Sequence, residues 1–478
     1  MLRLYMMFIF FLLNGALCYA NTESWPQSGM MMAVFMLNLV CVTIGFYRAM
    51  SVKTLNLDTI IWIFVYMFFF IAPVIQLQAG PLFPNTMPIE PGDVIRAGIV
   101  VFVWNVVYML FRSLHRPSAR RENAIGGSGL EIIGSRVRVL YFALSCGIFA
   151  MTIALFKLNY FFGAAEFGAV FANKSLLLLV NISFQGIVFA NWLFAFDDRR
   201  RYRSLVARMK LLLASVILLN QLSPFNTSRF YIGFCVILVV YLFYFPRLKP
   251  SQFIWIMFTG LLFIFPFLNM FRYGFGGYEM PTAYHLMFDQ LTELHFDAFS
   301  NLAATMRFTD LHGYSYGYQM LGVLFFFVPR DIWSGKPLSS GEAIGDFISG
   351  NYTLNFNNLS NPLPSEFMIN FGWVGVAAGA LLMALFVNRL ESSVGKNRYT
   401  HALIAGFLFI LLRGDLMNAF AYCFGTYCVM VLLPTGLSRF LDRAPRSSSS
   451  HSPRNGKENA GWTGSGIRPV TARANIRE

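Results

Sequence analysis

Basic residues occur at several points where an apolar stretch of this chain begins or ends. Charged groups at membrane depth are costly, so they indicate function by default. Guanidinium groups gathered at one membrane surface suit a diphosphate, because its planar oxygen pairs accept forked N–H donors. We therefore predict a diphosphate site, although each side chain alone also fits one that snorkels to the interface. The residues are Arg229, Arg272, Arg330, Lys336 and Arg413.

Two further residues could take or orient a proton. Glu366 lies where an apolar stretch begins, and the helix dipole stabilises a carboxylate near a helix N-terminus. Its alternative role is a first-turn cap. His312 lies in a loop beside Asp310, and a histidine can act as a base near neutral pH. We predict that Glu366 or His312 is the catalytic base.

Polar side chains interleaved with aromatic rings are typical of surfaces that bind sugars, although ordinary loops share this composition. On this basis we predict sugar contacts at Asn361, Asn370, Tyr314 and Trp333. The acidic residues Asp289, Glu293 and Asp297 recur at four-residue spacing, and we interpret them as a solvated helix face rather than a divalent-ion site. The predicted site needs no metal and no cofactor.

The composition decides which elements must position these residues. Of 478 residues, 56% are hydrophobic, 17% are aromatic and 13% are charged, which excludes a water-soluble globular protein. A membrane span needs about 20 apolar residues. About twelve stretches qualify, and we predict helices because an open strand leaves backbone groups unpaired in lipid. The stretches are 5–20, 30–47, 59–76, 95–111, 139–156, 176–196, 209–222, 230–246, 252–271, 367–388, 401–413 and 416–438.

Charge orients these helices. Most of the 37 Lys and Arg residues lie on alternate connections, and the positive-inside bias places those connections and both termini in the cytoplasm. Residues 272–366 then form one long external loop between an N-terminal membrane region, 1–271, and a C-terminal one, 367–440. We predict that residues 441–478 form a disordered basic tail in the cytoplasm. The first twenty residues also resemble a secretory signal, and either interpretation leaves the later topology unchanged.

The long external loop has helical content of its own. Apolar residues recur at helical spacing over 283–306, which predicts an amphipathic helix. The apolar stretch 318–328 is too short to cross a bilayer, so we predict a re-entrant or interfacial helix. The fold class is therefore an all-α polytopic membrane protein of about twelve transmembrane helices. Nucleic acid is not an expected partner, because the basic residues follow membrane topology.

Three motifs in the last third of the chain carry a family resemblance. They are the segment 328–337, which contains Pro329, Arg330, Trp333 and Lys336; the segment 364–372, followed by Gly375; and Arg413, Gly414 and Asp415. Together with the topology, they resemble the bacterial O-antigen or oligosaccharide repeat-unit polymerases of Wzy type. The resemblance implies an inner-membrane glycosyltransferase with a long periplasmic loop.

The resemblance also implies substrates. The donor would be a growing glycan on undecaprenyl diphosphate, and the acceptor a hydroxyl of another lipid-linked repeat unit. The basic residues would hold the diphosphate leaving group, and a chain-length regulator protein is an expected partner. Two alternatives remain, an O-antigen ligase and a transporter or flippase of lipid-linked oligosaccharides. A transporter usually places charged groups at the bilayer midplane, whereas here they collect at the outer rim.

Overall fold

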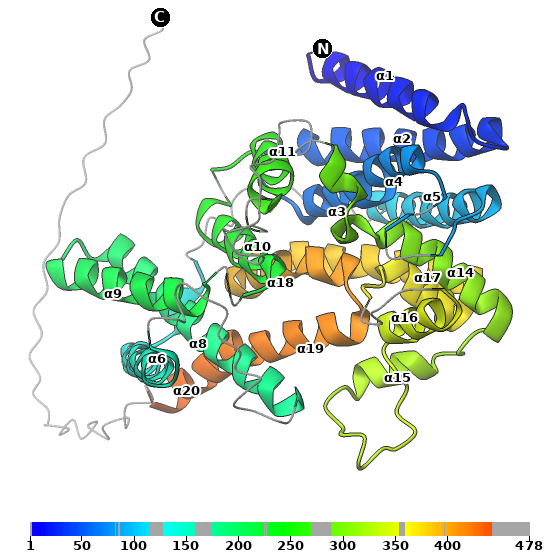
Figure 1. Cartoon of the computed structure of the whole chain (residues 1–478). Coiled ribbons are helices and arrows are strands. Elements are labelled where there is room, and N and C mark those ends of the chain that lie inside the picture. Colours follow the sequence, from blue (N-terminus) through cyan, green and yellow to red (C-terminus); the bar gives the residue numbers. More distant parts are fainter. Residues whose placement is uncertain are drawn as a thin grey trace, which may run out of the picture. The chain divides into compact units, whose positions relative to one another are not determined.

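The apolar stretches of the sequence form helices in the computed structural model of the chain (Figure 1). The structure describes residues 2–441, apart from 82, 85–86, 115–127, 158–173, 224, 226, 246, 267, 269–287, 353–358 and 396. The predicted tail therefore lies outside the described residues, except for its first residue. No β-strand occurs in the part of the chain that the structure describes.

The helices are α1 (Leu2–Thr22), α2 (Ser28–Ser51), α3 (Leu57–Tyr66), α4 (Ala72–Gln76), α5 (Pro91–Leu114), α6 (Ser135–Phe156), α8 (Lys174–Arg201), α9 (Leu205–Gln221), α10 (Arg229–Val239), α11 (Pro250–Thr259), α14 (Ala298–His312), α15 (Tyr318–Leu324), α16 (Ser340–Asn351), α17 (Leu363–Ser393), α18 (Arg398–Arg413), α19 (Leu416–Tyr427) and α20 (Leu433–Leu441). Short π-helical segments extend α3, α10, α11 and α19, namely Met67–Ile71, Val240–Tyr244, Gly260–Ile264 and Cys428–Leu432.

Eight helical runs in the described part are long and apolar enough to cross a membrane. The chain is therefore an all-α multi-pass membrane protein, as predicted. All twelve predicted stretches are helical over most of their described length, but four form shorter helices. These are α9 with 17 residues, α18 with 16 residues, and the runs Arg229–Tyr244 and Pro250–Ile264. The total of twelve spans remains a prediction.

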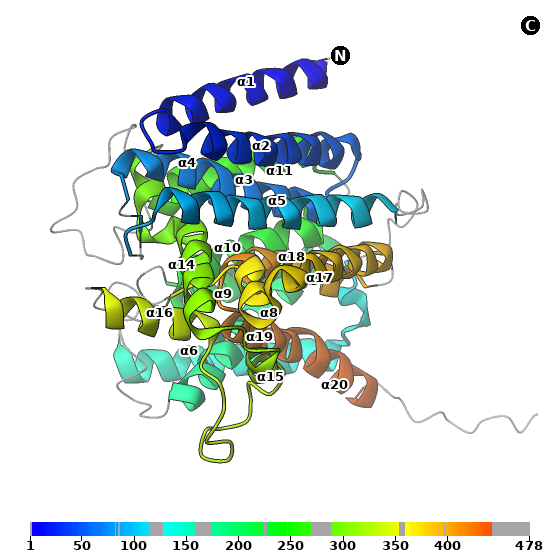
Figure 2. The ribbon, with the colours of Figure 1, turned by 90° about the vertical axis from the view of Figure 1, so that its right-hand side faces the viewer.

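The N-terminal helices pack around α2. α1 packs on α2, α2 packs on both α3 and α5, and α5 lies along α17. Figure 2 shows α1, α2 and α5 side by side above α17 and α18. A second group, α6, α8 and α9, packs largely on itself and meets the rest of the bundle through α19 and α20, and through ring contacts of α8 with α10 and its extension. α10 packs on α18, so the C-terminal helices lie between the two groups.

Ion pairs divide the helix ends into two sets. One set contains the ion pairs of Arg112 with Asp58 and Glu391, and of Arg138 with Asp197 and Asp198. The other contains Arg96 with Asp310, Arg307 with Glu90, and Arg413 with Asp297. Each ion pair between two described residues joins positions that the charge pattern predicts on the same side of the membrane. The predicted orientation is therefore compatible with the packing.

The prediction of one helix over 283–306 is wrong for residues 288–297, which precede α14. Residues 283–287 lie outside the described residues, Asp289–Thr292 and Leu294–Phe296 are 3-10 turns, and α14 begins only at Ala298. Distant side chains bind the carbonyl groups that a continuous helix would use internally. Gln76 donates to the carbonyls of Leu291 and Phe296 at 2.7 and 3.0 Å. The acidic residues at four-residue spacing therefore do not form a helical face.

Two other elements shape the segment before α17. α15 has seven residues, so it is about 10 Å long and cannot cross a bilayer core of about 30 Å. α17 bends at Gly372, where φ is +63°. A Cβ atom there would lie 2.7 Å from the ring of Tyr314, so both the backbone angle and the close approach of Tyr314 favour glycine.

Candidate active site

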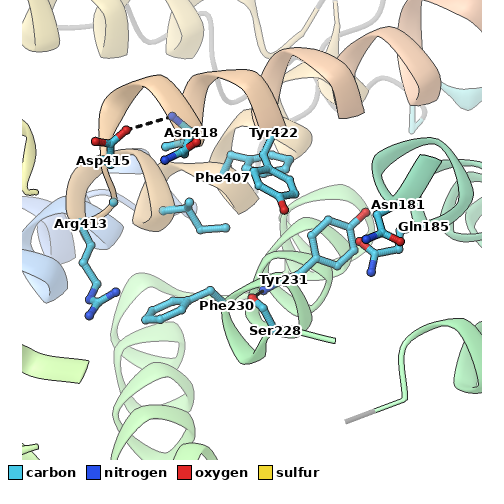
Figure 3. A pocket seen from close by; sticks show the side chains of 13 residues that line it. Asn181, Gln185, Ser228, Phe230, Tyr231, Phe407, Arg413, Asp415, Asn418 and Tyr422 are labelled. Carbon is cyan, nitrogen blue, oxygen red and sulfur yellow. Dashed lines mark hydrogen bonds between the residues drawn. The ribbon is translucent and has the colours of Figure 1, made fainter. Parts of the chain in front are cut away.

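Four helix ends surround a cavity of about 350 Å³. α8 and α10 contribute from their N-terminal halves, α18 from its C-terminal half and α19 from its N-terminal half. All four ends belong to the predicted external side. Figure 3 shows Asp415 and Asn418 near one end of the cavity, with Asn181 and Gln185 at the other. The polar lining residues are Asn181, Gln185, Ser228, Arg413, Asp415 and Asn418, and aromatic rings lie between them.

A tight turn between α18 and α19 brings a cation and an anion to this cavity. α18 ends as the Gly414 amide donates to the Ile410 carbonyl at 2.7 Å. α19 begins with Asp415 as its N-cap, since the Asp415 carboxylate accepts from the Asn418 amide at 3.1 Å. This turn places Arg413 and Asp415, which are two residues apart in sequence, in the lining of the same cavity.

Arg413 is held by two of its three guanidinium nitrogens. Nε donates to the His295 carbonyl at 3.0 Å, and Nη2 donates to the Asp297 carboxylate at 2.9 Å. The ring of Phe230 lies 4.7 Å from the guanidinium carbon. Nη1 forms no hydrogen bond with another described residue. The side chain is thus fixed in place while one nitrogen keeps N–H donors for a ligand.

Arg229 approaches the same backbone segment from α10. Its guanidinium contacts the ring of His295, donates to the Phe265 carbonyl at 3.3 Å and stacks on the Phe265 ring. Arg229 is buried, and its neighbours Ser228 and Phe230 line the cavity. The structure thus brings two of the five predicted basic residues, Arg229 and Arg413, together at His295.

Arg330 and Lys336, two other predicted phosphate ligands, do not line the cavity. Arg330 donates to the carbonyls of Lys336 and Pro337, and Lys336 donates to those of Phe326 and Val328 at 2.7 and 2.9 Å. Desolvation, followed by the charge of Arg330, lowers the pKa of the Lys336 ammonium. These two side chains hold the loop after α15 together. Arg272 lies outside the described residues.

A buried carboxyl pair meets one serine hydroxyl behind the cavity. The Ser340 hydroxyl contacts Glu366 and lies 3.3 Å from the carboxylate of Asp415. Asp415 also accepts from the Gly341 amide at 2.7 Å, and Glu366 accepts from the Leu416 amide at 2.8 Å. Glu366 is 2% exposed and does not line the cavity, whereas Asp415 does. Glu366 lies in the first turn of α17, as predicted, but it also binds the first amide of α19.

Substituting Gly341 tests this arrangement. A Cβ atom at Gly341 would lie 2.0 Å from the Leu359 carbonyl oxygen, so the start of α16 must move away from Asp415. We expect Gly341→Ala to cost about 1–3 kcal/mol of stability, measured by thermal unfolding of the purified protein. Gly350→Ala is the matched control, because nothing lies within 4 Å of a Cβ atom at Gly350 of the same helix. Equal stability of the two variants would contradict this packing.

The structure separates His312 from the cavity. His312 is the last residue of α14, where it is exposed, stacks on Phe308 and bonds to the Phe308 carbonyl at 3.1 Å. The helix rises about 1.5 Å per residue, so His312 lies about 22 Å from Asp297 along α14. Asp310, the acid beside it, pairs with Arg96. A direct role of His312 at Arg413 would therefore need a movement of this helix.

The four predicted sugar contacts also lie away from the cavity lining. Asn361 is fully buried and accepts from the Thr305 hydroxyl at 3.2 Å. Asn370 is equally buried and joins the Ser315 hydroxyl to the Glu366 carbonyl. The remaining two are more accessible: Tyr314 lies over the bend of α17, and Trp333 packs against Tyr318. Neither asparagine has a surface to offer a ligand in this arrangement.

Several residues of the site were not predicted from the sequence. They are Asp415, Asp297, Ser340, Asn181, Gln185 and Asn418. Asn181 and Gln185 carried a usable signal, because amides inside an apolar membrane helix are unfavourable and indicate function. The others depend on contacts between distant segments, which have no local signature.

Chemically, the site offers hydrogen-bond donors from a guanidinium, a carboxylate acceptor and several amides. Within the described ranges, no group of three His, Cys, Asp or Glu side chains could hold a metal ion. Comparison of the chain with models of protein families, with curated proteins and with solved structures gave no match.

Proposed function

We propose that this chain is a glycosyltransferase of a bacterial inner membrane that polymerises oligosaccharide repeat units linked to undecaprenyl diphosphate. The growing glycan is the donor, and a hydroxyl of another lipid-linked repeat unit is the acceptor. The cavity carries this proposal, because a guanidinium, a carboxylate and uncharged amides surround one space there. A ligand with both a diphosphate and sugar hydroxyls has groups to match each of them.

Arg413 is the proposed contact to the diphosphate. In the reaction, the bond between the anomeric carbon and the phosphate oxygen breaks, and its electron pair leaves with the lipid diphosphate. The free N–H groups of Arg413 would stabilise that developing charge. Asp297 and His295 fix the side chain beforehand, so little reorganisation is needed. Arg229 would support the same site by holding the His295 ring.

Asp415 is the proposed acceptor of the proton from the attacking hydroxyl. As the acceptor oxygen forms its bond to the anomeric carbon, its hydrogen must move to a base. Asp415 is the carboxylate that lines the cavity, and Glu366 lies behind it across the Ser340 hydroxyl. Glu366 therefore acts as a positioning residue in this scheme. No nucleotide sugar and no metal enter the reaction.

The position of the cavity also suits membrane-bound substrates. It lies at helix ends on the predicted external side, where a lipid headgroup would sit. Both substrates are anchored in one membrane surface, which lowers the entropy lost when they meet. The segregated ion pairs are compatible with this topology, and the positive-inside bias is the reason for proposing that this face, with the long segment 272–366, lies in the periplasm.

The glycan profile of a deletion strain tests the proposal. We expect loss of the gene to replace a ladder of long surface glycans by single repeat units, and the wild-type gene to restore the ladder. The physical reason is that each repeat unit is still made and delivered, but no longer joined to the next. An unchanged ladder would reject the proposal. Full-length glycan retained on the carrier lipid would indicate a ligase, and repeats retained at the cytoplasmic face a flippase.

A further inference from the structure

The cavity has a second polar end that no predicted residue explains. Asn181 and Gln185 are four residues apart on α8, so they share one face of that helix. They interrupt an apolar run that continues on both sides. Both line the cavity, at the end opposite Asp415 (Figure 3). Polar side chains in a membrane helix are unfavourable unless they find partners.

Neither amide is bonded to another described residue of the protein. Some buried amides elsewhere have partners: Asn38 donates to the carbonyls of Val34 and Gly98, and Asn105 donates to Asn38. The Asn191 amide, farther along α8, bonds to no described residue either, but it lies outside the cavity lining. An amide side chain has two N–H donors and one carbonyl acceptor. Asn181 and Gln185 therefore present four donors and two acceptors to the cavity. Those groups fit a ligand that can both donate and accept.

Close packing of α8 on α19 fixes this end of the cavity. A Cβ atom at Gly186 would lie 3.0 Å from Val429, and one at Gly425 would lie 3.1 Å from Ile182. Small residues at a crossing let two membrane helices approach closely. The crossing holds Asn181 and Gln185 in a cavity that Tyr422 of α19 also lines. Amide groups and an aromatic ring thus line the same narrow space.

We propose that this α8 end of the cavity binds a sugar ring of the lipid-linked repeat unit. Sugar hydroxyls donate and accept hydrogen bonds, as the amides do, and the C–H face of a sugar packs on an aromatic ring such as Tyr422. The diphosphate would lie at Arg413, at the other end of the cavity. The cavity would thus hold the sugar and the diphosphate of one substrate at opposite ends. This inference rests on the proposed function and assigns specificity for the sugar to α8.

Binding measurements with two partial ligands test the inference. One ligand is the oligosaccharide released by mild acid from the lipid-linked glycan of the cells, and the other is undecaprenyl diphosphate without sugar. We expect Asn181→Ala/Gln185→Ala to weaken binding of the oligosaccharide about tenfold or more, as lost hydrogen bonds imply. Binding of undecaprenyl diphosphate should change less than about twofold, and Arg413→Gln should give the opposite pattern.

Asn191→Ala is the matched control, because Asn191 is a buried asparagine of the same helix outside the cavity lining. It should leave both affinities near those of the wild type. Unchanged oligosaccharide binding by the double variant, or equal weakening of both ligands, would overturn the inference. So would a comparable loss in Asn191→Ala. A wild-type protein that binds the oligosaccharide but does not extend lipid-linked repeats would reject polymerisation and keep the sugar site.

Discussion

Replacing Arg413 by glutamine is expected to abolish chain extension and to destabilise the protein. The substitution removes the donors proposed to hold the diphosphate, and loss of one such preorganised donor typically lowers kcat by about 10²–10³. It also removes the guanidinium that pairs with the buried carboxylate of Asp297 at 2.9 Å, while the hydrogen bonds that Asp297 accepts from Asn301 and Ser360 remain. Breaking a buried ion pair costs about 3–5 kcal/mol. The measurements are the glycan ladder of complemented cells and thermal unfolding of the purified protein.

A double variant separates these two effects. Arg413→Gln/Asp297→Asn removes both charges of the buried ion pair, so its stability should exceed that of Arg413→Gln alone. Its glycans should nevertheless remain single repeat units. Arg96→Gln is the control, since Arg96 belongs to an exposed ion pair on the same predicted side, worth about 0–1 kcal/mol. A glycan ladder restored in the double variant would show that Arg413 serves only to neutralise Asp297.

The helices could be predicted from the sequence because their signal is local. A long run of apolar residues has no alternative to a helix in lipid, so each helix could be predicted without knowledge of its neighbours. The turns before α14 could not be predicted in this way. Apolar spacing over 283–306 fits a helix, yet Gln76 and Arg413 bind carbonyls of that segment from far along the chain. A contact between distant residues overrides the local pattern.

The same distinction explains the site. Arg413 and Glu366 stand out because a charge beside an apolar stretch is visible in one dimension. Asp297 was interpreted as solvated, since nothing near it in sequence reveals that Arg413 covers it. Ser340 is one serine among many until the fold places it between two carboxyl groups. The type of chemistry was thus predictable, whereas the pairing of residues was not.

The substitution Asp415→Asn is expected to lower kcat by about 10²–10⁴, the usual effect of losing a general base. Asparagine can still cap α19, so the helix should form. The two carboxylate oxygens of Asp415 accept from the backbone amides of Asn418 and Gly341, respectively. Asparagine has only one side-chain oxygen, so one of these hydrogen bonds is lost and the variant should also be less stable. Steady-state extension of lipid-linked repeats by the purified variant measures the fall in kcat, and retained binding of undecaprenyl diphosphate shows that the cavity is intact.

Glu366→Gln provides the comparison that assigns the base. One oxygen of Glu366 accepts from both Ser340 and the Leu416 amide, and glutamine keeps such an oxygen while losing the charge. Because Glu366 acts through Ser340, its substitution should lower kcat less than Asp415→Asn does, with little change in KM. A larger loss in Glu366→Gln, with Asp415→Asn near wild-type turnover, would transfer the role of base to Glu366. The proton would then have to reach Glu366 through the Ser340 hydroxyl, because Glu366 does not line the cavity.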